Sequence, residues 1–430
     1  MENHASSGTD DRNFLWGVSS SAFQIEGYIE NDMTEWERGG YFKQNGKDPK
    51  YLNAVNHWNL WKNDFQLLKA LGINSYRLSF EWSRIEPEPG HFDEKALDKY
   101  ERMIDRLIEM NIRPMLTLHH FTHPLWFHTE TPWTEETAIQ SFIRFAEKIL
   151  QKIGHKITHF ITLNEPVVWA LAAYGDARFP PGEKNLEKMA DVLKNMLLAH
   201  REVFHLIKKY NSGAKVGIAD NFIIFKPSRE WNLLDRGISY LIHRFYNLGL
   251  LDAFHRNRLN VVFPFLIHFR EELELQDAID FWGINYYYRM HVRFRLNWKQ
   301  PMELQFLNRS GEGLSDMGWE NYSHGLWQVM TWVKNTGKPF IITENGIADR
   351  QDRQRVKFLE KHLKIVQKAL DSGFPIEGYF HWSLMDNYEW LEGRSAKFGL
   401  YAVDDQDGMK RKLRTSGRFY SDYIKKHRAI

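Results

Sequence analysis

The chain has 430 residues, of which 43% are hydrophobic and 15% aromatic, so it can build a large buried core and lacks the composition of a disordered protein. Lysine and arginine (57) nearly balance aspartate and glutamate (55), and the formal net charge of +2 gives no electrostatic reason to expect a nucleic-acid partner. The absence of cysteine excludes disulfides, thiolate metal sites and cysteine nucleophiles, and it fits a reducing compartment.

The beginning of the chain is polar. Residues 1–12 contain no apolar stretch of the kind found in secretory signals, and we expect them to form a flexible N-terminal extension. The longest apolar runs, at residues 167–174 and 261–267, are far too short to span a bilayer. We therefore predict a cytoplasmic protein with no membrane partner, in which residues 13–430 form a single domain.

Strand-like and helical patterns alternate from residue 14 onward. Short apolar segments rich in β-branched and aromatic residues predict strands at residues 14–18, 75–80, 113–118, 159–164, 215–219, 281–286, 339–343 and 376–382. Helical periodicity predicts helices at residues 58–71, 94–110, 135–153, 189–210, 233–254, 325–336, 353–372 and 416–427. The predicted N-caps are Asp93, Asp352 and Ser416, and the predicted C-terminal stops are Gly72, Gly213, Gly337 and Gly373.

This alternation indicates an α/β fold with a parallel sheet. Eight predicted strands alternate with eight predicted helices, which is the number in a (β/α)8 TIM barrel, and we predict a single barrel of this kind. A doubly wound sheet is the alternative, but the first predicted strand is not followed by a G-x-G-x-x-G phosphate loop.

Polar and aromatic residues follow the predicted strands. In a TIM barrel the catalytic groups stand at the C-terminal ends of the strands. Seven of the predicted strands lead into such groups, which are Gln24 and Glu26; Glu81; His119 and His120; Asn164 and Glu165; Asn285, Tyr286 and Tyr287; Glu344 and Asn345; and His381, Trp382 and Ser383. One polar residue at a strand end is ordinary, but seven ends that meet at one rim predict a functional site.

Two glutamates in this set are candidates for acid–base chemistry. Glu165 follows the fourth predicted strand and Glu344 the seventh, each after a mostly apolar segment. An ionised carboxylate is costly to bury, so Glu165 should be paired, protonated or placed at the mouth of a cavity. Hydrolysis of a glycosidic bond requires two carboxyl groups across a pocket, because one protonates the leaving oxygen while the other attacks the anomeric carbon or activates water.

A sugar pocket also needs flat aromatic side chains for the apolar faces of the ring and polar groups for its hydroxyls. The sequence supplies this mixture near the strand ends with Gln24, His120, Asn164, Trp319, Trp382, Glu389, Trp390 and Phe398. Aromatic side chains also dominate protein cores, and we expect core packing for Trp61 and Trp332, which stand at helical spacing. The segment from Trp382 to Trp390 directly follows a predicted strand, which favours the pocket.

Eight sequence blocks occur in one order along the chain. They are FLWGVSSSAFQIEG (14–27), YRLSFEWSRIEPEPG (76–90), TLHHFTHPLWF (117–127), TLNEP (162–166), GINYYY (283–288), MGWENYSHGL (317–326), ITENG (342–346) and WSLMDNYEW (382–390). Over nearly its whole length the chain thereby resembles glycoside hydrolase family 1, the β-glucosidase and β-glycosidase family. The fold of that family is a (β/α)8 barrel, in agreement with the strand count.

The resemblance implies a retaining mechanism with Glu344 as the nucleophile and Glu165 as the acid/base, their carboxyl groups about 5 to 5.5 Å apart. Arg77 and Tyr287 match the residues that hydrogen-bond the nucleophile. The residues that match the hydroxyl-binding set of the glycone site are Gln24, His120, Asn164, Glu389 and Trp390. We assign to the same pocket Trp382 as its floor, Trp319 as an aglycone wall, and Phe121, Asn285 and Phe398.

Several finer expectations follow from the same motifs. Phe121 replaces the tryptophan usual after the family's histidine, which puts the glycone preference in doubt. The bond between Trp382 and Ser383 matches a place where the family has a cis peptide, and we predict one here. The charge of Glu344 should raise the pKa of Glu165, and Pro166 should favour an extended backbone at Glu165.

We predict a retaining β-glycosidase that releases terminal neutral sugars from small-molecule or oligosaccharide β-glycosides, with β-glucosides favoured and β-galactosides or β-fucosides as alternatives. A 6-phospho-β-glycosidase is disfavoured because Glu389 would repel a phosphate, although Lys397 weakly favours it. A catalytically inactive carbohydrate-binding barrel is disfavoured by the presence of both glutamates. The sequence does not indicate an oligomeric state.

We expect no cofactor and no metal. The run His119, His120 and His123 could suggest a metal cluster. Adjacent histidines on a strand point to opposite faces, however, so the run does not predict a metal site.

Overall fold

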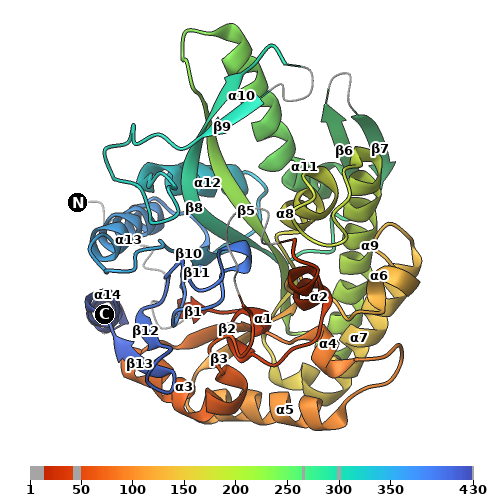
Figure 1. The fold of residues 1–430 in the computed structure, drawn as a ribbon, viewed down its shortest axis with the longest axis vertical. Coiled ribbons are helices and arrows are strands. Elements are labelled where there is room, and N and C mark those ends of the chain that lie inside the picture. Colours follow the sequence, from red (N-terminus) through yellow and green to blue (C-terminus); the bar gives the residue numbers. More distant parts are fainter. Residues whose placement is uncertain (1–13, 42–49, 264–266, 298–301, 429–430) are drawn as a thin grey trace, which may run out of the picture.

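The computed structural model describes residues 14–41, 50–263, 267–297 and 302–428. The N-terminal extension predicted for residues 1–12 lies outside these ranges. At the centre is a closed barrel of eight parallel strands with helices around it (Figure 1). The predicted TIM barrel is therefore confirmed, while the number of domains stays a prediction.

All eight predicted strands are present. In chain order they are β1 (Leu15–Ser19), β2 (Ser75–Ser79), β3 (Arg113–His119), β4 (His159–Asn164), β5 (Lys215–Pro227), β8 (Phe281–Phe294), β10 (Phe340–Asn345) and β11 (Ile376–Trp382). Each pairs in parallel with the next along this order, and β11 pairs with β1 to close the barrel. The carboxyl ends of the strands consequently meet at one rim.

The outer layer consists of one long helix or helix pair after each strand. These helices are α3 (His57–Leu71), α5 (Glu94–Glu109), α7 (Thr137–Ile153), α9 (Leu186–Tyr210), α10 (Leu233–Tyr246) with α11 (Gly249–Arg256), α12 (Ser323–Lys334), α13 (Arg355–Asp371) and α14 (Thr415–Arg428). Shorter helices lie between a strand and the long helix that follows it, namely α1 (Ala22–Glu26), α2 (Asp32–Arg38), α4 (Trp82–Ile85), α6 (Phe127–Glu130) and α8 (Pro166–Ala170).

The helix predicted over residues 233–254 is wrong as a single element. Asn247 separates α10 from α11 and is fully buried. Its side chain donates to the carbonyl of Ile223 at 2.8 Å and accepts from the amide of Ile223 at 2.9 Å. Asn247 thus pairs with the backbone of β5 as a strand residue would, and this tertiary contact interrupts the helical periodicity.

Strands β5 and β8 run further than predicted. They remain paired as far as Pro227 and Val292, beyond the rim, where β9 (Met302–Gln305) adds to β8 in antiparallel fashion. Figure 1 shows this extension rising past the barrel beside α10. Two hairpins were also not predicted, β6 (Arg258–Phe263) with β7 (Ile267–Glu272) and β12 (Tyr401–Asp404) with β13 (Lys410–Leu413).

The barrel interior is filled by side chains. One buried cluster contains a residue from nearly every strand: Leu15, Met115, Ile161, Ala219, Phe281, Ile341 and Phe380. Gly17 on β1 leaves room for this cluster, because a Cβ at that position would lie 2.4 Å from the ring of Phe380. The interior is consequently a packed core, and the chemistry is confined to the rim above it.

Two of the three predicted N-caps, Asp352 and Ser416, are wrong. Asp93 caps α5 as predicted, accepting hydrogen bonds from the amides of Lys95 and Ala96. Asp352 does not cap the helix that follows it, and Ser416 lies inside α14. Asp352 instead accepts from the amide of Ser416 at 2.8 Å, so it caps a helix distant in sequence.

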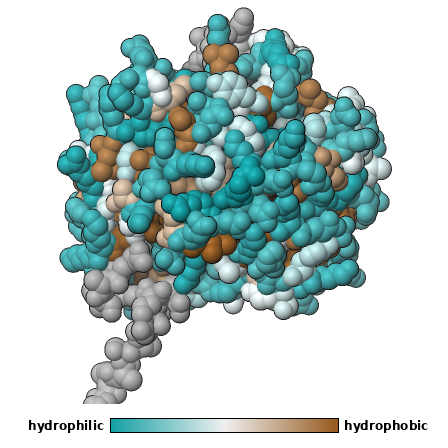
Figure 2. All heavy atoms as spheres, turned by 90° about the horizontal axis from the view of Figure 1, so that it is seen from below, coloured by the Kyte–Doolittle hydropathy of each residue, from teal (hydrophilic) through white to brown (hydrophobic). Residues whose placement is uncertain are grey.

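The surface agrees with a barrel whose helices turn polar faces outward. The face shown in Figure 2 is mostly hydrophilic, with hydrophobic residues scattered over it. Among the described residues, none of the helices combines the length and the apolar character needed to cross a membrane.

Candidate active site

The strand ends bring polar side chains together at the carboxyl rim of the barrel. Arg77 comes from β2, Asn164 and Glu165 from the end of β4, and Glu344 from β10. Asn285 on β8 pairs in register with Glu344, and Asn221 on β5 pairs with Asn285. The order of the strands around the barrel therefore sets which of these side chains are neighbours.

Glu344 is held by two hydrogen-bond donors. The guanidinium of Arg77, which is fully buried, donates to one carboxylate oxygen, and the hydroxyl of Tyr287 donates to the other at 2.5 Å. Burial, followed by the charge of Glu344, raises the pKa of Tyr287 well above its usual range, so the phenol keeps its proton. A permanent cation and a phenol donor both favour the ionised form of Glu344.

Glu165 has the opposite environment. Its Oε1 accepts hydrogen bonds from Nδ2 of Asn285 at 2.7 Å and of Asn221 at 3.2 Å. Burial raises the pKa of Glu165 to about 8, and the charge of Glu344 adds to the effect. The predicted rise is thus present, but burial contributes more to it than Glu344 does. Glu165 is protonated at neutral pH.

The backbone at Glu165 differs from the prediction. Its φ of 47° and ψ of 56° are left-handed, whereas we expected an extended conformation before Pro166. The amide of Glu165 donates to the carbonyl of Ala219 at 2.7 Å, and Pro166 begins α8 at its first position. Glu165 therefore occupies a sharp turn between strand and helix, which the steric effect of the proline alone did not reveal.

Asn164 forms hydrogen bonds both with neighbours of the two glutamates and with His120. Its Oδ1 accepts from Arg77 at 2.6 Å and from Asn285 at 3.1 Å, so its Nδ2 is left to donate to Nε2 of His120 at 3.3 Å. Burial lowers the pKa of His120 well below its usual range, so the ring is neutral. The hydrogen of His120 therefore sits on Nδ1, a buried donor with no partner among the described residues.

A third carboxyl group, that of Glu389, lies near enough to Glu344 and Glu165 for their charges to act on it. Gln24 on α1 donates to it at 3.2 Å, and Trp382 also hydrogen-bonds its side chain. Burial raises the pKa of Glu389 to about 8, with smaller contributions from the charges of Glu344 and Glu165. Three carboxyl groups in one cavity thus avoid carrying three negative charges at neutral pH.

Aromatic rings form the walls. His120 stacks with Trp382 at 6.1 Å and with Trp390 at 6.2 Å between ring centroids. Phe121 packs against Trp390 at 5.0 Å. Near Tyr287, a second group joins Trp319 to Phe398 at 6.3 Å, and both rings contact Tyr287. The bond between Trp382 and Ser383 is cis, as predicted.

All the predicted site residues lie in the described part of the chain, and they lie together at this rim. The sequence model of glycosyl hydrolase family 1 matches residues 7–429. The chain belongs to glycosyl hydrolase family 1. It is accordingly a glycoside hydrolase.

Relatives of this family 1 chain can be aligned with it over nearly their full lengths. It is 32% identical to a 1,4-beta-D-glucan glucohydrolase of Thermotoga neapolitana and to beta-glucosidase A of Thermotoga maritima, in each case over 96% of this chain and 97% of the relative. A solved structure of a beta-glycosidase from Pyrococcus horikoshii is similar with a TM-score of 0.89 at 35% identity, covering 98% of this chain and 95% of that one.

Some side chains of this family 1 site were not predicted. Asn221 contacts Glu165 directly, and Tyr246 donates to Oδ1 of Asn221 at 2.8 Å. Asn221 lies two residues after the predicted end of the fifth strand, so the rule applied to the other strand ends would have found it. Tyr246 comes from α10, and the sequence contains no signal that relates it to Glu165.

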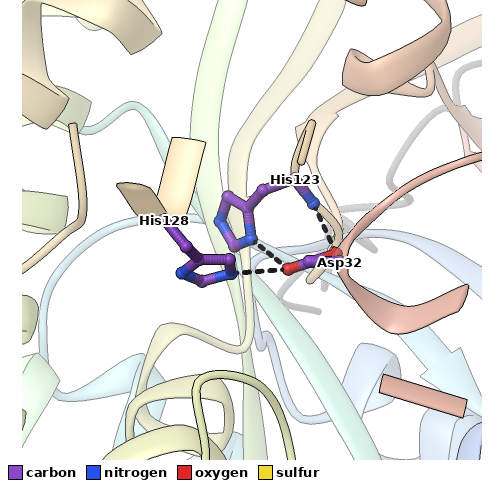
Figure 3. Close-up of side chains that lie close together, drawn as sticks. All are labelled: Asp32, His123 and His128. Carbon is purple, nitrogen blue, oxygen red and sulfur yellow. Dashed lines mark hydrogen bonds and ion pairs between the residues drawn. The ribbon is translucent and has the colours of Figure 1, made fainter. Parts of the chain in front are cut away.

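The described residues contain one group whose ligand atoms lie close enough for a metal, namely Asp32, His123 and His128 (Figure 3). Oδ2 of Asp32 lies 2.9 Å from Nδ1 of His123 and 2.9 Å from Nε2 of His128. Burial raises the pKa of Asp32, but the hydrogen bonds with His123 and His128 act against it, and the pKa lies below its usual range.

The surroundings of His123 argue against a metal there. Nε1 of Trp133, which can only donate, is bonded to Nε2 of His123 at 2.8 Å. Nδ1 of His123 must therefore carry the hydrogen that Asp32 accepts, and a metal at Nδ1 would displace it and set Nε2 against Trp133. His119 bonds His123 while His120 stacks with Trp382, so the adjacent histidines separate as the strand predicts.

A hollow of about 650 Å³ lies beside the aromatic group near Tyr287. It is lined by Asp316, Met317, Asp349, Arg350, Gln351, Arg353, Gln354, Glu392, Ser395 and Ala396. Ala396 belongs to the cluster that contains Tyr287 and Trp382, and Met317 packs against it, so this hollow adjoins the aromatic cluster. Neither proposed catalytic glutamate lines it.

Proposed function

We propose that the protein hydrolyses terminal β-linked neutral sugars with retention, using Glu344 as the nucleophile and Glu165 as the acid/base. The observation that carries this proposal is the contrast between the two glutamates. Arg77 and Tyr287 favour an ionised Glu344, whereas burial and the charge of Glu344 keep Glu165 protonated up to a pKa of about 8. A nucleophile and a proton donor are thus ready in the same cavity.

The first step forms a covalent intermediate. An oxygen of Glu344 attacks the anomeric carbon, the bond from that carbon to the glycosidic oxygen breaks, and Glu165 transfers its proton to the departing oxygen. Esterification removes the negative charge of Glu344, so the pKa of Glu165 falls and its carboxylate becomes a base for the second step.

The second step restores the enzyme. Glu165 takes a proton from water, the water oxygen attacks the anomeric carbon, and the ester bond to Glu344 breaks to return its carboxylate. Two inversions at one carbon leave the sugar with its original β configuration. Retention at the anomeric centre is therefore an observable consequence of the roles assigned to the two glutamates.

Recognition of a neutral glycone is supported by the polar groups at Gln24, His120 and Glu389. The repulsion argument against a 6-phosphate is weaker than expected, because Glu389 is neutral below a pH of about 8. Lys397 does not decide between the two substrates, since its Nζ lies 4.0 Å from a carboxylate oxygen of Asp386, which already accepts from Arg414. The names of the Thermotoga relatives favour a β-glucoside.

A nucleophile variant tests the assignment. Glu344→Ala should lower hydrolysis of 4-nitrophenyl β-glucoside by at least about 10³-fold, and azide should restore turnover by giving the glycosyl azide of inverted configuration. The matched Glu389→Ala variant should lose activity without azide rescue, because it does not remove the nucleophile.

The alternative of an inactive carbohydrate-binding barrel makes the opposite forecast. If the wild-type protein binds but does not hydrolyse a panel of aryl β-glycosides, the assigned chemistry is wrong.

We also propose a cytoplasmic location, on the absence of cysteine from the sequence. Cell fractionation with an antibody to the protein would test that location.

A further inference from the structure

Helix α10 reaches the active site through its last residue. Tyr246 is buried, and its hydroxyl donates to Oδ1 of Asn221 at 2.8 Å. The next residue, Asn247, is fixed to the backbone of Ile223 by two hydrogen bonds of 2.8 and 2.9 Å. The ring of Tyr246 also packs edge-on against Phe225 at 5.5 Å. These contacts hold the hydroxyl of Tyr246 at a fixed place over β5.

We propose that Tyr246 is a positioning residue for Glu165, holding Asn221 so that its amide donates to Oε1 and the transferable proton sits on Oε2. This inference rests on the proposed function, in which Glu165 is the proton donor. It concerns residues that do not react themselves, and it adds an element outside the barrel to the catalytic arrangement.

The two amides on Glu165 are oriented by different means. Asn285 must present Nδ2 to Glu165, because the same nitrogen donates to Oδ1 of Asn164, which in turn accepts from Arg77. Arginine can only donate, so this orientation is fixed from within the barrel. Asn221 depends instead on the hydrogen bond from Tyr246: because its Oδ1 accepts from the phenol, its Nδ2 is left to donate to Oε1 of Glu165.

The consequence for proton transfer is geometric. Oε1 accepts from both Asn221 and Asn285, so a proton on that oxygen would displace one of the amide donors. Among the described residues no hydrogen bond to Oε2 is found, which leaves Oε2 free to carry the proton and present it to a leaving group. Burial, followed by neighbouring phenols and carboxyls, raises the pKa of Tyr246 well above its usual range, so it remains a donor throughout.

Other ionisable groups act on Glu165 as well, and any pH dependence reflects all of them. They come from β10, β2, β5, β8 and the segment after β11, and they are Glu344, Arg77, Asp220, Tyr287, Tyr288 and Glu389. The decisive measurement therefore compares leaving groups at one pH, where these groups are the same for every substrate.

The test measures kcat/KM of Tyr246→Phe on aryl glycosides that share one glycone. 2,4-Dinitrophenolate departs without a proton, whereas a phenyl or 4-methylphenyl group needs one. We expect about a tenfold loss for the poor leaving groups and a change within about twofold for dinitrophenyl. The control is Tyr240→Phe on the same helix, which is 61% exposed and should change neither rate.

A second variant and the pH profile make the test specific. Asn221→Ala removes the same donor and should show the same selective loss, so it keeps the test decisive if Tyr246→Phe does not fold. In the double variant the two losses should not add. Both variants should move the alkaline limit for the phenyl substrate to higher pH, because a hydrogen bond that lowers the pKa of Glu165 is weakened.

The possible failures are distinguishable. An equal loss for all leaving groups, no loss, or additive losses in the double variant would overturn the role of Tyr246 and leave the proposed function intact. If instead the wild-type protein hydrolyses neither dinitrophenyl nor phenyl glycosides of any glycone, the proposed function fails first, and the inference about Tyr246 fails with it.

Discussion

Glu165 and Glu344 carry the same side chain in one cavity, yet their surroundings favour different protonation states. Arg77 and Tyr287 both donate to Glu344, while Glu165 accepts from the neutral amides of Asn221 and Asn285. A cation bonded directly to a carboxylate favours its charge, whereas burial raises the pKa of Glu165 more than the charge of Arg77, which is not bonded to it, lowers it. At the scale of single residues, the environment therefore separates a nucleophile from an acid.

This separation predicts the pH dependence of catalysis. Glu165 must carry a proton in the first step, and its pKa is about 8. The kcat/KM for a phenyl β-glucoside should therefore stay constant at pH values below this pKa and fall about tenfold per pH unit above it. A Glu165→Gln variant, which cannot titrate, should lack this limb when tested on the dinitrophenyl glycoside. If the kcat/KM of the wild-type protein already began to fall near pH 5, the role assigned to Glu165 would be contradicted.

At the scale of elements, the ends of helices are joined by side chains distant in sequence. Asp352 precedes α13 but accepts hydrogen bonds from the amide and hydroxyl of Ser416, at the start of α14. It also pairs with the buried guanidinium of Arg355. One carboxylate thus caps the last helix and neutralises a buried cation, so it fixes α13 and α14 to each other.

Removal of this carboxylate should destabilise the fold more than loss of an ordinary cap. Asp352→Ala should cost about 2 to 4 kcal/mol, because it removes a cap and leaves Arg355 without its carboxylate partner. Asp93→Ala, which removes only the cap of α5, should cost about 1 kcal/mol. Thermal unfolding checks the difference. Equal midpoints for the two variants would show that the shared cap has no special role.

At the scale of the whole molecule, closure of the barrel buries polar groups that the rim does not use. Asp220 on β5 is fully buried, and among the described residues its carboxyl group has no cation and no side-chain donor bonded to it. Burial, with a smaller contribution from the charge of Glu165, raises the pKa of Asp220 well above 3.8. The folded protein therefore keeps a proton there that the unfolded chain releases.

This proton makes the free energy of unfolding depend on pH. Because the folded state binds the proton more tightly, stability falls as pH rises above 3.8 and stops falling at the folded pKa, by up to about 1.4 kcal/mol per pH unit. Asp220→Asn should match the wild type near pH 3.8 and exceed it increasingly at higher pH. Unfolding midpoints from pH 4 to 8 test this, and a constant difference would refute it.

The sequence by itself determined the strands, the order of the elements and the rim. Eight apolar segments predict buried parallel strands, and a polar residue directly after such a segment lies at the rim formed by the carboxyl ends of the strands. Glu165, Glu344 and Trp382 could therefore be located without coordinates. The sequence also determined most helices, since apolar side chains at helical spacing, such as Leu97, Ile104 and Leu107 in α5, must face the barrel.

Only the tertiary structure decided which side chains meet across elements. Asn247 ends α10 because it pairs with the backbone of Ile223, Asp352 caps α14, and Tyr246 reaches Glu165 through Asn221. Each partner is far away in sequence or unremarkable by type, so no local pattern reports the contact. The same holds for protonation. The sequence showed that an ionised Glu165 would be costly to bury, but the neighbours that set its pKa come from four other strands.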